Sequence, residues 1–596
     1  MFACQASLRV VNQLPPTSTQ SPRGHIFRYD HGVRQPQYRD FVMHNKLMLS
    51  AISLAMLSST HVWAQSLPSG QVPDAGRILQ ELPIPQQELP QSIRLDVDAP
   101  EPSTEKVGGP KVELKAVRFT ENTRIDDASL QSVVAPAIGQ SLDLDGLREL
   151  ARQVTLYYRK QGYPFARAYL PAQRMANGEL TIEVIEGRYG KVTAATEDEK
   201  LAAQAQPFLA DLEPGDVIER DRLERAVLVL SDLPGVAVRP VIRPGEAVGT
   251  GDLDARVSKT RAFEGKATLD NHGNRYSGRN RLTVQGDWNS PLMLGDRLTA
   301  AIMATDEELY FGSIGYSLPL GTSGLRGNLG YAQSAYDLGE EFADLGATGT
   351  AKVTSIGLSY PLLRSNQANV MLAGQYQHKA LEDEYEVLGL SYEKSSQTLP
   401  VSLQFDLRDS LLGGGITYGG ATLTYGELDL DSALRGGDRL TAQTQGEFSK
   451  VNVDLARLQA LPANFTLFAR FLGQWSEDNL DSSEDFSLGG INGVRAYPQS
   501  EASGDEGMLT QVELRYQAGA FTPYLFWDAG KVRINRNPWL HEDNYRSLSG
   551  GGVGLRVQHG RLSFDGTVAW RHHGGEAQSD TRQENPQLLA QIGYQF

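Results

Sequence analysis

The chain has 596 residues and a formal net charge of −16, from 56 Lys and Arg against 72 Asp and Glu. This acidic balance excludes nucleic acid as an expected partner, because a polyanion binds basic surfaces. No stretch reaches the roughly 18 consecutive apolar residues of a transmembrane helix, so a helical membrane protein is excluded. The 60 Gly and 23 Tyr, in a chain that is only 40% hydrophobic, instead indicate many β-strands of alternating polarity.

The first recognisable element is a secretory signal peptide at residues 43–64. Lys46 precedes an apolar run over residues 47–57, and Ala64 supplies the small residue that signal peptidase requires before the cut. We therefore predict an exported protein whose mature chain begins at Gln65. Residues 1–64 carry six basic and two acidic groups, so the mature chain keeps 50 against 70 and a net charge of −20.

This signal peptide begins unusually late in the sequence. Residues 1–42 show no periodic pattern, and we predict that translation starts at Met43 and that the preceding residues are an upstream extension; an extended signal region is the alternative. The single Cys of the sequence, Cys4, lies in this stretch. The mature chain is therefore expected to form no disulfide and no Cys-ligated metal site.

Residues 65–110 are rich in Pro, Gln and Glu, which is typical of a linker. Within it, Asp74 is placed to cap a short helix over about residues 74–82 that ends before Pro83. The apolar face of this helix would consist of Ile78, Leu79 and Leu82. A helix of about eight residues is not stable alone in water, so it requires a host surface.

Residues 111–187 are predicted to form a small α+β module with the order β-α-α-β-β. Its expected elements are a strand over 112–119, a helix after Asp126, a longer helix, and strands over 165–170 and 180–185. The longer helix is the clearest, with Gly162 where it should end and apolar residues at helical spacing: Leu147, Leu150, Ala151, Val154 and Tyr158. A looser copy of the pattern over residues 188–258 makes the module an internal repeat.

The helical period is absent from residues 259–596. The last strand is the cleanest case of the pattern that replaces it, with apolar and polar residues alternating: Leu588, Ala590, Ile592, Tyr594 and Phe596 against Gln591, Gly593 and Gln595. Such strands predict a transmembrane antiparallel β-barrel with lipid outside and water inside. A soluble β-sandwich, the alternative, would need an apolar inner face. Sixteen strands allow about 21 residues for each strand and loop, and fourteen or eighteen would fit nearly as well.

Two motifs in the second half of the barrel region point to a family. Residues 489–497 read Gly-Gly-Ile-Asn-Gly-Val-Arg-Ala-Tyr, and residues 526–530 read Phe-Trp-Asp-Ala-Gly. On these motifs the chain resembles the two-partner secretion transporters (TpsB), whose loop with Val-Arg-Gly-Tyr folds back into the barrel. In that family the loop Arg reaches the Asp of a Phe-x-Asp-x-Gly motif on a later strand.

The resemblance implies a loop motif of Val494, Arg495, Ala496 and Tyr497, and a wall motif of Phe526, Asp528 and Gly530. Ala496 stands where the family has Gly, and Ala disfavours only backbone conformations with positive φ. A pairing of Arg495 with Asp528 is also physically reasonable without the resemblance, because an Arg inside a barrel needs a carboxylate partner. A spacing of two residues also places the wall motif on one face of a strand. Considered alone, Arg495 would be interpreted as a solvated loop cation; the presence of both motifs after two tandem modules favours the buried pair instead.

The rest of the mature chain shares the resemblance. Residues 111–187 and 188–258 resemble POTRA domains, which bind substrate in the periplasm, and the helix at 74–82 matches the family's plug helix. Phe596 resembles the C-terminal signal that the barrel assembly machinery reads; a lipid-facing aromatic residue is the simpler interpretation. The implied location is the outer membrane of a Gram-negative bacterium, with outer-membrane lipid around the barrel.

The implied function is ATP-independent export of one large exoprotein with an N-terminal secretion domain, adhesin- or haemolysin-like. An assembly factor that inserts other barrels is the alternative within the superfamily, and a general diffusion porin is a further one. No enzyme, cofactor or metal site is expected. The glycines of residues 413–415 and 551–554 open no helix, His572 and His573 lack further ligands, and no Gly-x-Ser-x-Gly motif occurs.

Overall fold

The computed structural model describes residues 72–82, 96–97, 109–175, 177–539, 541 and 543–596. The predicted extension and signal peptide, residues 1–64, lie outside this part of the chain. Among the described residues, no helix combines the length and the apolar character needed to cross a membrane.

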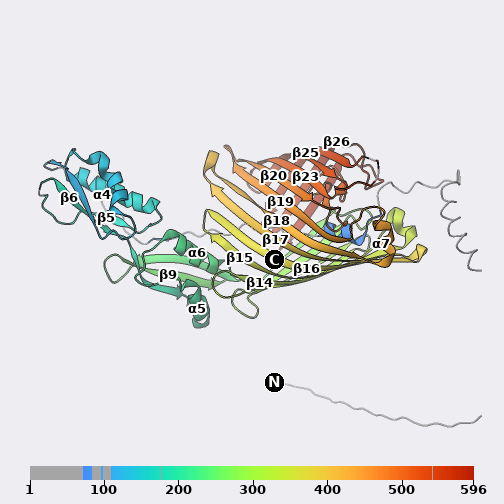
Figure 1. Cartoon of the computed structure of the whole chain (residues 1–596), viewed down its shortest axis with the longest axis horizontal. Coiled ribbons are helices and arrows are strands. Elements are labelled where there is room, and N and C mark those ends of the chain that lie inside the picture. The colour runs from blue at the N-terminus through green and yellow to red at the C-terminus, as the bar shows by residue number, and fades with distance from the viewer. Residues whose placement is uncertain (1–71, 83–95, 98–108, 176, 540, 542) are drawn as a thin grey trace, which may run out of the picture. The chain divides into compact units, whose positions relative to one another are not determined.

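In the described part of the chain, sixteen antiparallel strands close into a barrel, which confirms the predicted sixteen-stranded fold (Figure 1). Sequential strands pair with one another, and β27 pairs with β10 to close the ring. The strands are β10 (Phe263–Asp270), β11 (Arg281–Asn289), β12 (Arg297–Thr305), β13 (Tyr310–Pro319), β14 (Arg326–Asp337), β15 (Ala347–Arg364), β16 (Ala368–Tyr385), β17 (Leu390–Asp409), β18 (Gly415–Leu430), β19 (Gly446–Ala460), β20 (Phe465–Ser476), β23 (Glu506–Tyr516), β24 (Phe521–Arg533), β25 (Tyr545–His559), β26 (Leu562–His573) and β27 (Gln587–Gln595).

Alternation of side chains explains why these segments form one closed sheet. In β24, Leu525 and Trp527 are exposed on the outside, whereas Phe526 and Asp528 are buried on the lumen side. The period of two thus separates a lipid-facing face from a polar interior. A sandwich of two sheets, the alternative from sequence, is excluded because the sheet closes on itself.

The first α+β module, module 1, has the predicted order: β3 (Ala116–Thr120), α3 (Asp127–Val134), α4 (Leu144–Lys160), β5 (Arg167–Tyr169) and β6 (Glu179–Ile185), with sheet order β3-β6-β5. The single strand expected over 112–119 is instead two strands. β2 (Val112–Glu113) pairs with β4 (Ser141–Leu142), and only β3 joins the main sheet. The backbone partners change between the two strands, because Leu114 donates to Gln140 and Lys115 donates to Gly178. A short 3₁₀ helix, η1 (Ala135–Ala137), follows α3. The apolar face of α4 covers the sheet.

Module 2 repeats this arrangement with β7 (Arg188–Ala195), α5 (Glu199–Ala205), η2 (Gln206–Leu209), α6 (Arg220–Ser231), β8 (Val236–Pro244) and β9 (Thr250–Lys259). Its sheet has the order β1-β8-β9-β7. The added strand, β1 (Asp96–Val97), comes from the linker and pairs in parallel with β8. A segment outside the module therefore occupies one edge of its sheet.

Module 2 contacts one end of the barrel, which we call the module end. Arg364 of β15 forms an ion pair of 2.7 Å with Asp232, and the Ser290 hydroxyl donates to the Pro234 carbonyl at 2.7 Å. The opposite end carries the longer connections, and we call it the loop end. They include η3 (Glu340–Leu345), η4 (Glu386–Leu388), α7 (Ser432–Asp438), β21 (Phe486–Ser487) and β22 (Ser503–Gly504), while η5 (Leu411–Gly413) lies in a turn at the module end.

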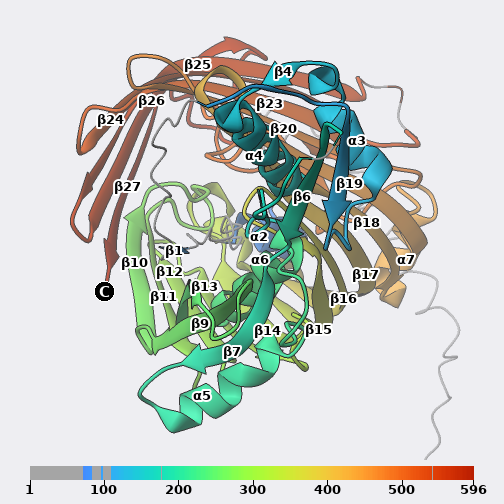
Figure 2. The ribbon, with the colours of Figure 1, turned by 90° about the vertical axis from the view of Figure 1, so that its left-hand side faces the viewer.

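A short helix, α2 (Ala75–Glu81), lies inside the ring of strands (Figure 2). Its N-terminus is capped by Asp74, whose carboxylate accepts the backbone N–H of Arg77. Ala75, Ile78 and Leu82 are buried in one apolar cluster with residues of the lumen wall and of three connections at the loop end. The host surface that so short a helix requires is therefore the barrel interior.

Candidate functional site

The connection between β20 and β23, residues 477–505, is called L6 and folds back into the lumen. β21 and β22 pair to form its stem. At its tip, the N–H of Val494 donates to the carbonyl of Leu488 at 2.6 Å, which closes a compact turn. Leu488, Val494, Ala496 and Tyr497 have no solvent exposure. The tip is thus packed against the barrel wall.

Arg495 makes the central polar contact of the tip, which we call the tip anchor. Its Nε and Nη2 donate to the two carboxylate oxygens of Asp528 at 2.8 and 2.7 Å, and its backbone N–H donates to the same carboxylate at 3.2 Å. Its Nη1 donates to Glu513 at 2.5 Å, and the guanidinium lies 3.7 Å from the centre of the Phe526 ring. The Arg495 and Asp528 side chains are 4% and 0% exposed. The contact is therefore a desolvated, bidentate ion pair.

Sequence reasoning missed Glu513, the second carboxylate of the tip anchor. Glu513 lies on β23, directly across from Phe526 of β24 in the strand register. It also accepts from Arg515 at 2.7 Å and from Arg556 at 3.1 Å. The alternation of β23 places Glu513 on the lumen face. That alternation was readable in the sequence, but the pairing of Glu513 with Arg495 of the folded-back loop was not.

Glycines of the barrel wall leave room for the tip. A Cβ at Gly530 would lie 2.5 Å from Leu488, and one at Gly550 would lie 2.5 Å from the Cβ of Ala496. Ala496 itself does not have positive φ, so the replacement of the family's Gly causes no backbone strain at this position. Its extra methyl group is accommodated because the facing wall residue is Gly550.

The remaining loop-motif residue, Tyr497, joins the tip to the last hairpin of the barrel. Its hydroxyl donates to carbonyl oxygens of His573 and Gly575, at 2.9 and 3.0 Å, and Arg571 lies 5.0 Å from the centre of its ring. The structure therefore brings all seven residues of the two motifs into one site on the lumen wall. His573 contributes its backbone here, and the described residues contain no group of His, Cys, Asp and Glu that could hold a metal ion.

The second lumenal site surrounds α2. At one end of the helix, Asp74 pairs with Lys394 of β17 at 2.8 Å and accepts from Ser482 of L6 at 2.6 Å. Burial alone would raise the pKa of Asp74, but the Lys394 ammonium and these hydrogen bonds hold it well below its ordinary value. Ile78 and Leu82 are buried, and Leu79 is half-buried against the same apolar cluster.

The other end of α2 carries a buried carboxylate. Glu81 accepts hydrogen bonds from Asn274 at 3.2 Å, Ser277 at 3.1 Å and Ser500 at 2.6 Å. Burial raises the pKa of Glu81 above its ordinary value, and these three hydrogen bonds only partly offset that effect. The neighbouring Gln80 donates to backbone carbonyls of L6. Both ends of α2 are therefore bound to loops as well as to the wall.

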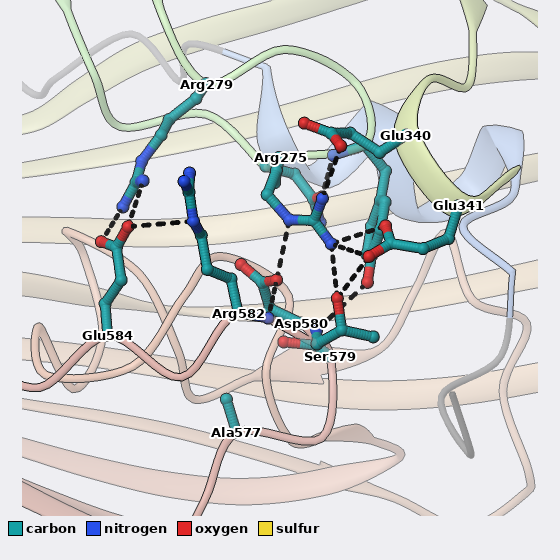
Figure 3. A network of polar contacts seen from close by, with 12 residues as sticks. Arg275, Arg279, Glu340, Glu341, Ala577, Ser579, Asp580, Arg582 and Glu584 are labelled. Carbon is teal, nitrogen blue, oxygen red and sulfur yellow. Dashed lines mark hydrogen bonds and ion pairs between the residues drawn. The ribbon is translucent and has the colours of Figure 1, made fainter. Parts of the chain in front are cut away.

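A cluster of ion pairs joins three connections at the loop end, L1 (residues 271–280), L3 (338–346) and L8 (574–586), as Figure 3 shows. We call it the loop-end clasp. Its pairs are Arg275 with Glu340 (3.0 Å), Glu341 (2.6 Å) and Asp580 (2.9 Å), and Arg279 with Glu584 (2.5 Å). L1 follows β10, and L8 precedes β27. These two strands pair with each other over five residues, which is the shortest pairing between neighbouring strands of the described barrel. The clasp therefore bridges the seam at which the barrel closes.

The clasp also lies over the apolar niche of α2. Tyr276 of L1 and Phe342 of L3 belong to the same apolar cluster as Ile78, and their rings meet edge to face at 4.7 Å. Phe596, by contrast, lies away from the lumen: it is 49% exposed, and its backbone pairs with Gly265 of β10. Of the predicted site residues, only Phe596 thus belongs to the outer, lipid-facing surface.

Comparisons with known proteins agree with this architecture. The model of the haemolysin secretion/activation protein family (ShlB/FhaC/HecB) matches residues 249–557, and that of the ShlB-type POTRA domain matches residues 112–187. The heme/hemopexin transporter protein HuxB of Haemophilus influenzae is 25% identical over 529 residues, which cover 86% of this chain and 92% of that protein. The outer membrane transporter CdiB of Dickeya dadantii is 25% identical over 501 residues, covering 81% and 87%. In fold, the chain is similar to CdiB from Escherichia coli, with a TM-score of 0.66 and 22% identity over 84% of this chain and 93% of that one.

Proposed function

The chain belongs to the haemolysin secretion/activation family of two-partner secretion transporters, and from this premise we propose a cycle of docking, plug release and threading for its export of a partner exoprotein. It is a pore of the outer membrane with POTRA domains in the periplasm. The module end of the barrel accordingly faces the periplasm, and the loop end faces the cell exterior. The family membership favours this function over an assembly factor that inserts other barrels.

The observation that carries the proposal is α2 in the barrel lumen. An isolated helix of seven residues is held there by contacts with loops and wall, and it is joined to module 1 by a Pro-rich linker. Such a helix has no stability of its own, so it unfolds once it leaves its niche. A segment of this kind suits a plug that closes the pore at rest. A general diffusion porin would need neither the plug nor the modules.

Docking of the exoprotein is proposed to use a sheet edge of the POTRA domains. The pairing of β1 with β8 supports this, because it demonstrates that the edge of module 2 accepts an extended segment. The exoprotein's N-terminal secretion domain would add a strand at such an edge and displace the linker. The same linker carries α2, so its displacement would loosen the tether of the plug.

Threading is proposed to need no nucleotide. The exoprotein crosses the lumen in extended form, and its folding outside the cell prevents return. The tip anchor of Arg495 and Asp528 is proposed to hold L6 during this passage, and Phe596 to direct insertion of the barrel by the assembly machinery. We assign no catalytic step to any residue.

The experiment measures single-channel conductance of the mature protein in a planar bilayer, with and without residues 72–82. A larger and steadier conductance after the deletion is expected. An unchanged conductance would refute the plug. In parallel, deletion of residues 111–187 is expected to abolish secretion of the exoprotein from cells while the barrel still inserts, because docking is proposed to use both POTRA domains. Persistent secretion would refute that requirement.

A further inference from the structure

The plug helix rests on one segment of L6, residues 481–485, which we call the plug seat. Gln80 donates to the carbonyl oxygens of Ser482 and Asp485 at 2.8 and 2.9 Å. A Cβ at Gly76 would lie 2.3 Å from the Ser482 hydroxyl and 2.7 Å from the Ser483 nitrogen. The helix backbone therefore lies directly against the seat, and the position of the seat determines whether the niche fits α2.

Glu484 fixes the plug seat to the barrel wall. It forms ion pairs with Lys379 of β16 and, at 2.8 Å, with Lys450 of β19. The three side chains are only 6–11% exposed. Lys450 and Gln474 also donate to the backbone carbonyl of Glu484, at 2.7 and 2.8 Å. We call Glu484 with its two lysines the seat clamp.

The seat clamp is separate from the tip anchor. It uses β16 and β19, whereas Arg495 is held by β23 and β24. Lys394 of β17 adds a further cation, because it pairs with Asp481 of the seat as well as with Asp74 of the plug. Wall lysines thus converge on the part of L6 that touches the plug. Without Glu484, two of them would face each other in a nearly desolvated pocket, which is strongly unfavourable.

We propose that Glu484, Lys379 and Lys450 are positioning residues for gating: the seat clamp holds the plug seat in the conformation that retains α2. Loss of the clamp releases the seat and raises the open fraction of the pore, while the tip anchor stays formed. This inference rests on the proposed role of α2 as the plug.

The test is single-channel recording of Glu484→Gln in the intact mature protein and in the protein that lacks residues 72–82. In the intact protein the open fraction of the pore is expected to rise about tenfold or more, because the substitution breaks a buried ion pair that stabilises the closed state. In the protein without the plug, Glu484→Gln is expected to change nothing. Glu477→Gln is the matched control, since it removes the same charge from an exposed position of the same loop.

Each outcome is informative. If the deletion of 72–82 leaves conductance unchanged, the plug itself is wrong. If the deletion opens the pore but Glu484→Gln behaves as the parent protein, the seat clamp is refuted. An equal effect of Glu484→Gln in both backgrounds would also refute it, because it would reveal damage to the barrel. Should Glu484→Gln fail to insert, Lys379→Met, which retains the Lys450 pair, is expected to raise the open fraction only in the protein that has the plug.

Discussion

Replacing Arg495 by Met is expected to release the tip of L6 from the barrel wall. In the native protein, Arg495 is the one cation within ion-pair distance of Asp528 among the described residues, whereas Glu513 also has Arg515 and Arg556. The substitution therefore leaves a fully buried carboxylate with no cation beside it, and only the backbone N–H of residue 495 still donates to it. Met retains much of the apolar contact with the Phe526 ring, so the lost charge dominates the effect.

The magnitude follows from burial. Breaking a buried ion pair costs about 3–5 kcal/mol, against about 0.2–1 kcal/mol for an exposed one. At about 1.4 kcal/mol per factor of ten, the opening equilibrium of the tip shifts by roughly two to three and a half orders of magnitude. Adding Asp528→Asn removes the uncompensated charge, so the double variant is expected to recover part of this cost.

Amide hydrogen exchange of residues 488–497, followed by mass spectrometry on the purified barrel, measures this opening. In Arg495→Met, exchange of the tip is expected to accelerate by roughly two to three and a half orders of magnitude, and secretion of the exoprotein is expected to fall sharply. In the double variant, the acceleration is expected to be smaller. Arg470→Met is the matched control. Arg470 binds Asp454 in the same bidentate geometry, at 3.0 and 2.7 Å, but the two side chains are 30% and 45% exposed. If the exchange rate of the tip in Arg495→Met stays within a few-fold of the rate in the parent protein, the buried-pair argument is refuted.

Three further predictions concern the fit of the tip, the plug and the loop end. Gly550→Ala is expected to accelerate exchange of the tip, because its methyl group would lie 2.5 Å from Ala496; Ala496→Gly in the same protein should partly reverse this, and no reversal would refute the steric explanation. Because burial in the docked state raises the pKa of Glu81 above its ordinary value, Glu81 favours the plugged state at acidic pH, and this contribution is lost as pH rises through the raised pKa. The open fraction should therefore rise as the pH is increased above the ordinary range of a Glu carboxyl, and Glu81→Gln should flatten that rise. Arg275→Gln removes hydrogen bonds worth about 1.5–3 kcal/mol each to charged groups, so exchange of residues 577–584 is expected to increase at least tenfold, and an unchanged rate would refute the clasp.

Local patterns in the sequence predicted local structure well. The apolar spacing from Leu147 to Tyr158 predicted α4, and the alternation near the C-terminus predicted β27. The prediction of one continuous strand over residues 112–119 was wrong, because β2 and β3 pair with different partners. Strand propensity alone carries no information about which partner a segment finds.

The candidate site was predictable only in part. Resemblance predicted that Arg495 would meet Asp528, and the structure has this contact. The sequence predicted neither the pair of Glu484 with Lys379 nor the loop-end clasp. Glu484 and Lys379 lie 105 residues apart, and members of the clasp lie up to 305 residues apart, so no local pattern pairs them. Lumen-facing charges can be recognised from alternation, but their partners depend on how the loops fold back.

The two anchors of L6 differ in what their release would expose to water. The tip carries Leu488, Val494 and Tyr497, all fully buried in an apolar cluster, so moving it would expose apolar surface at a cost proportional to area. The plug seat, residues 481–485, reads Asp-Ser-Ser-Glu-Asp and contains no apolar side chain. When the seat leaves the wall, its charges and those of the wall lysines regain water, which compensates much of the lost ion-pair energy. The seat can therefore detach more readily than the tip, and release of the plug does not require the tip anchor to open.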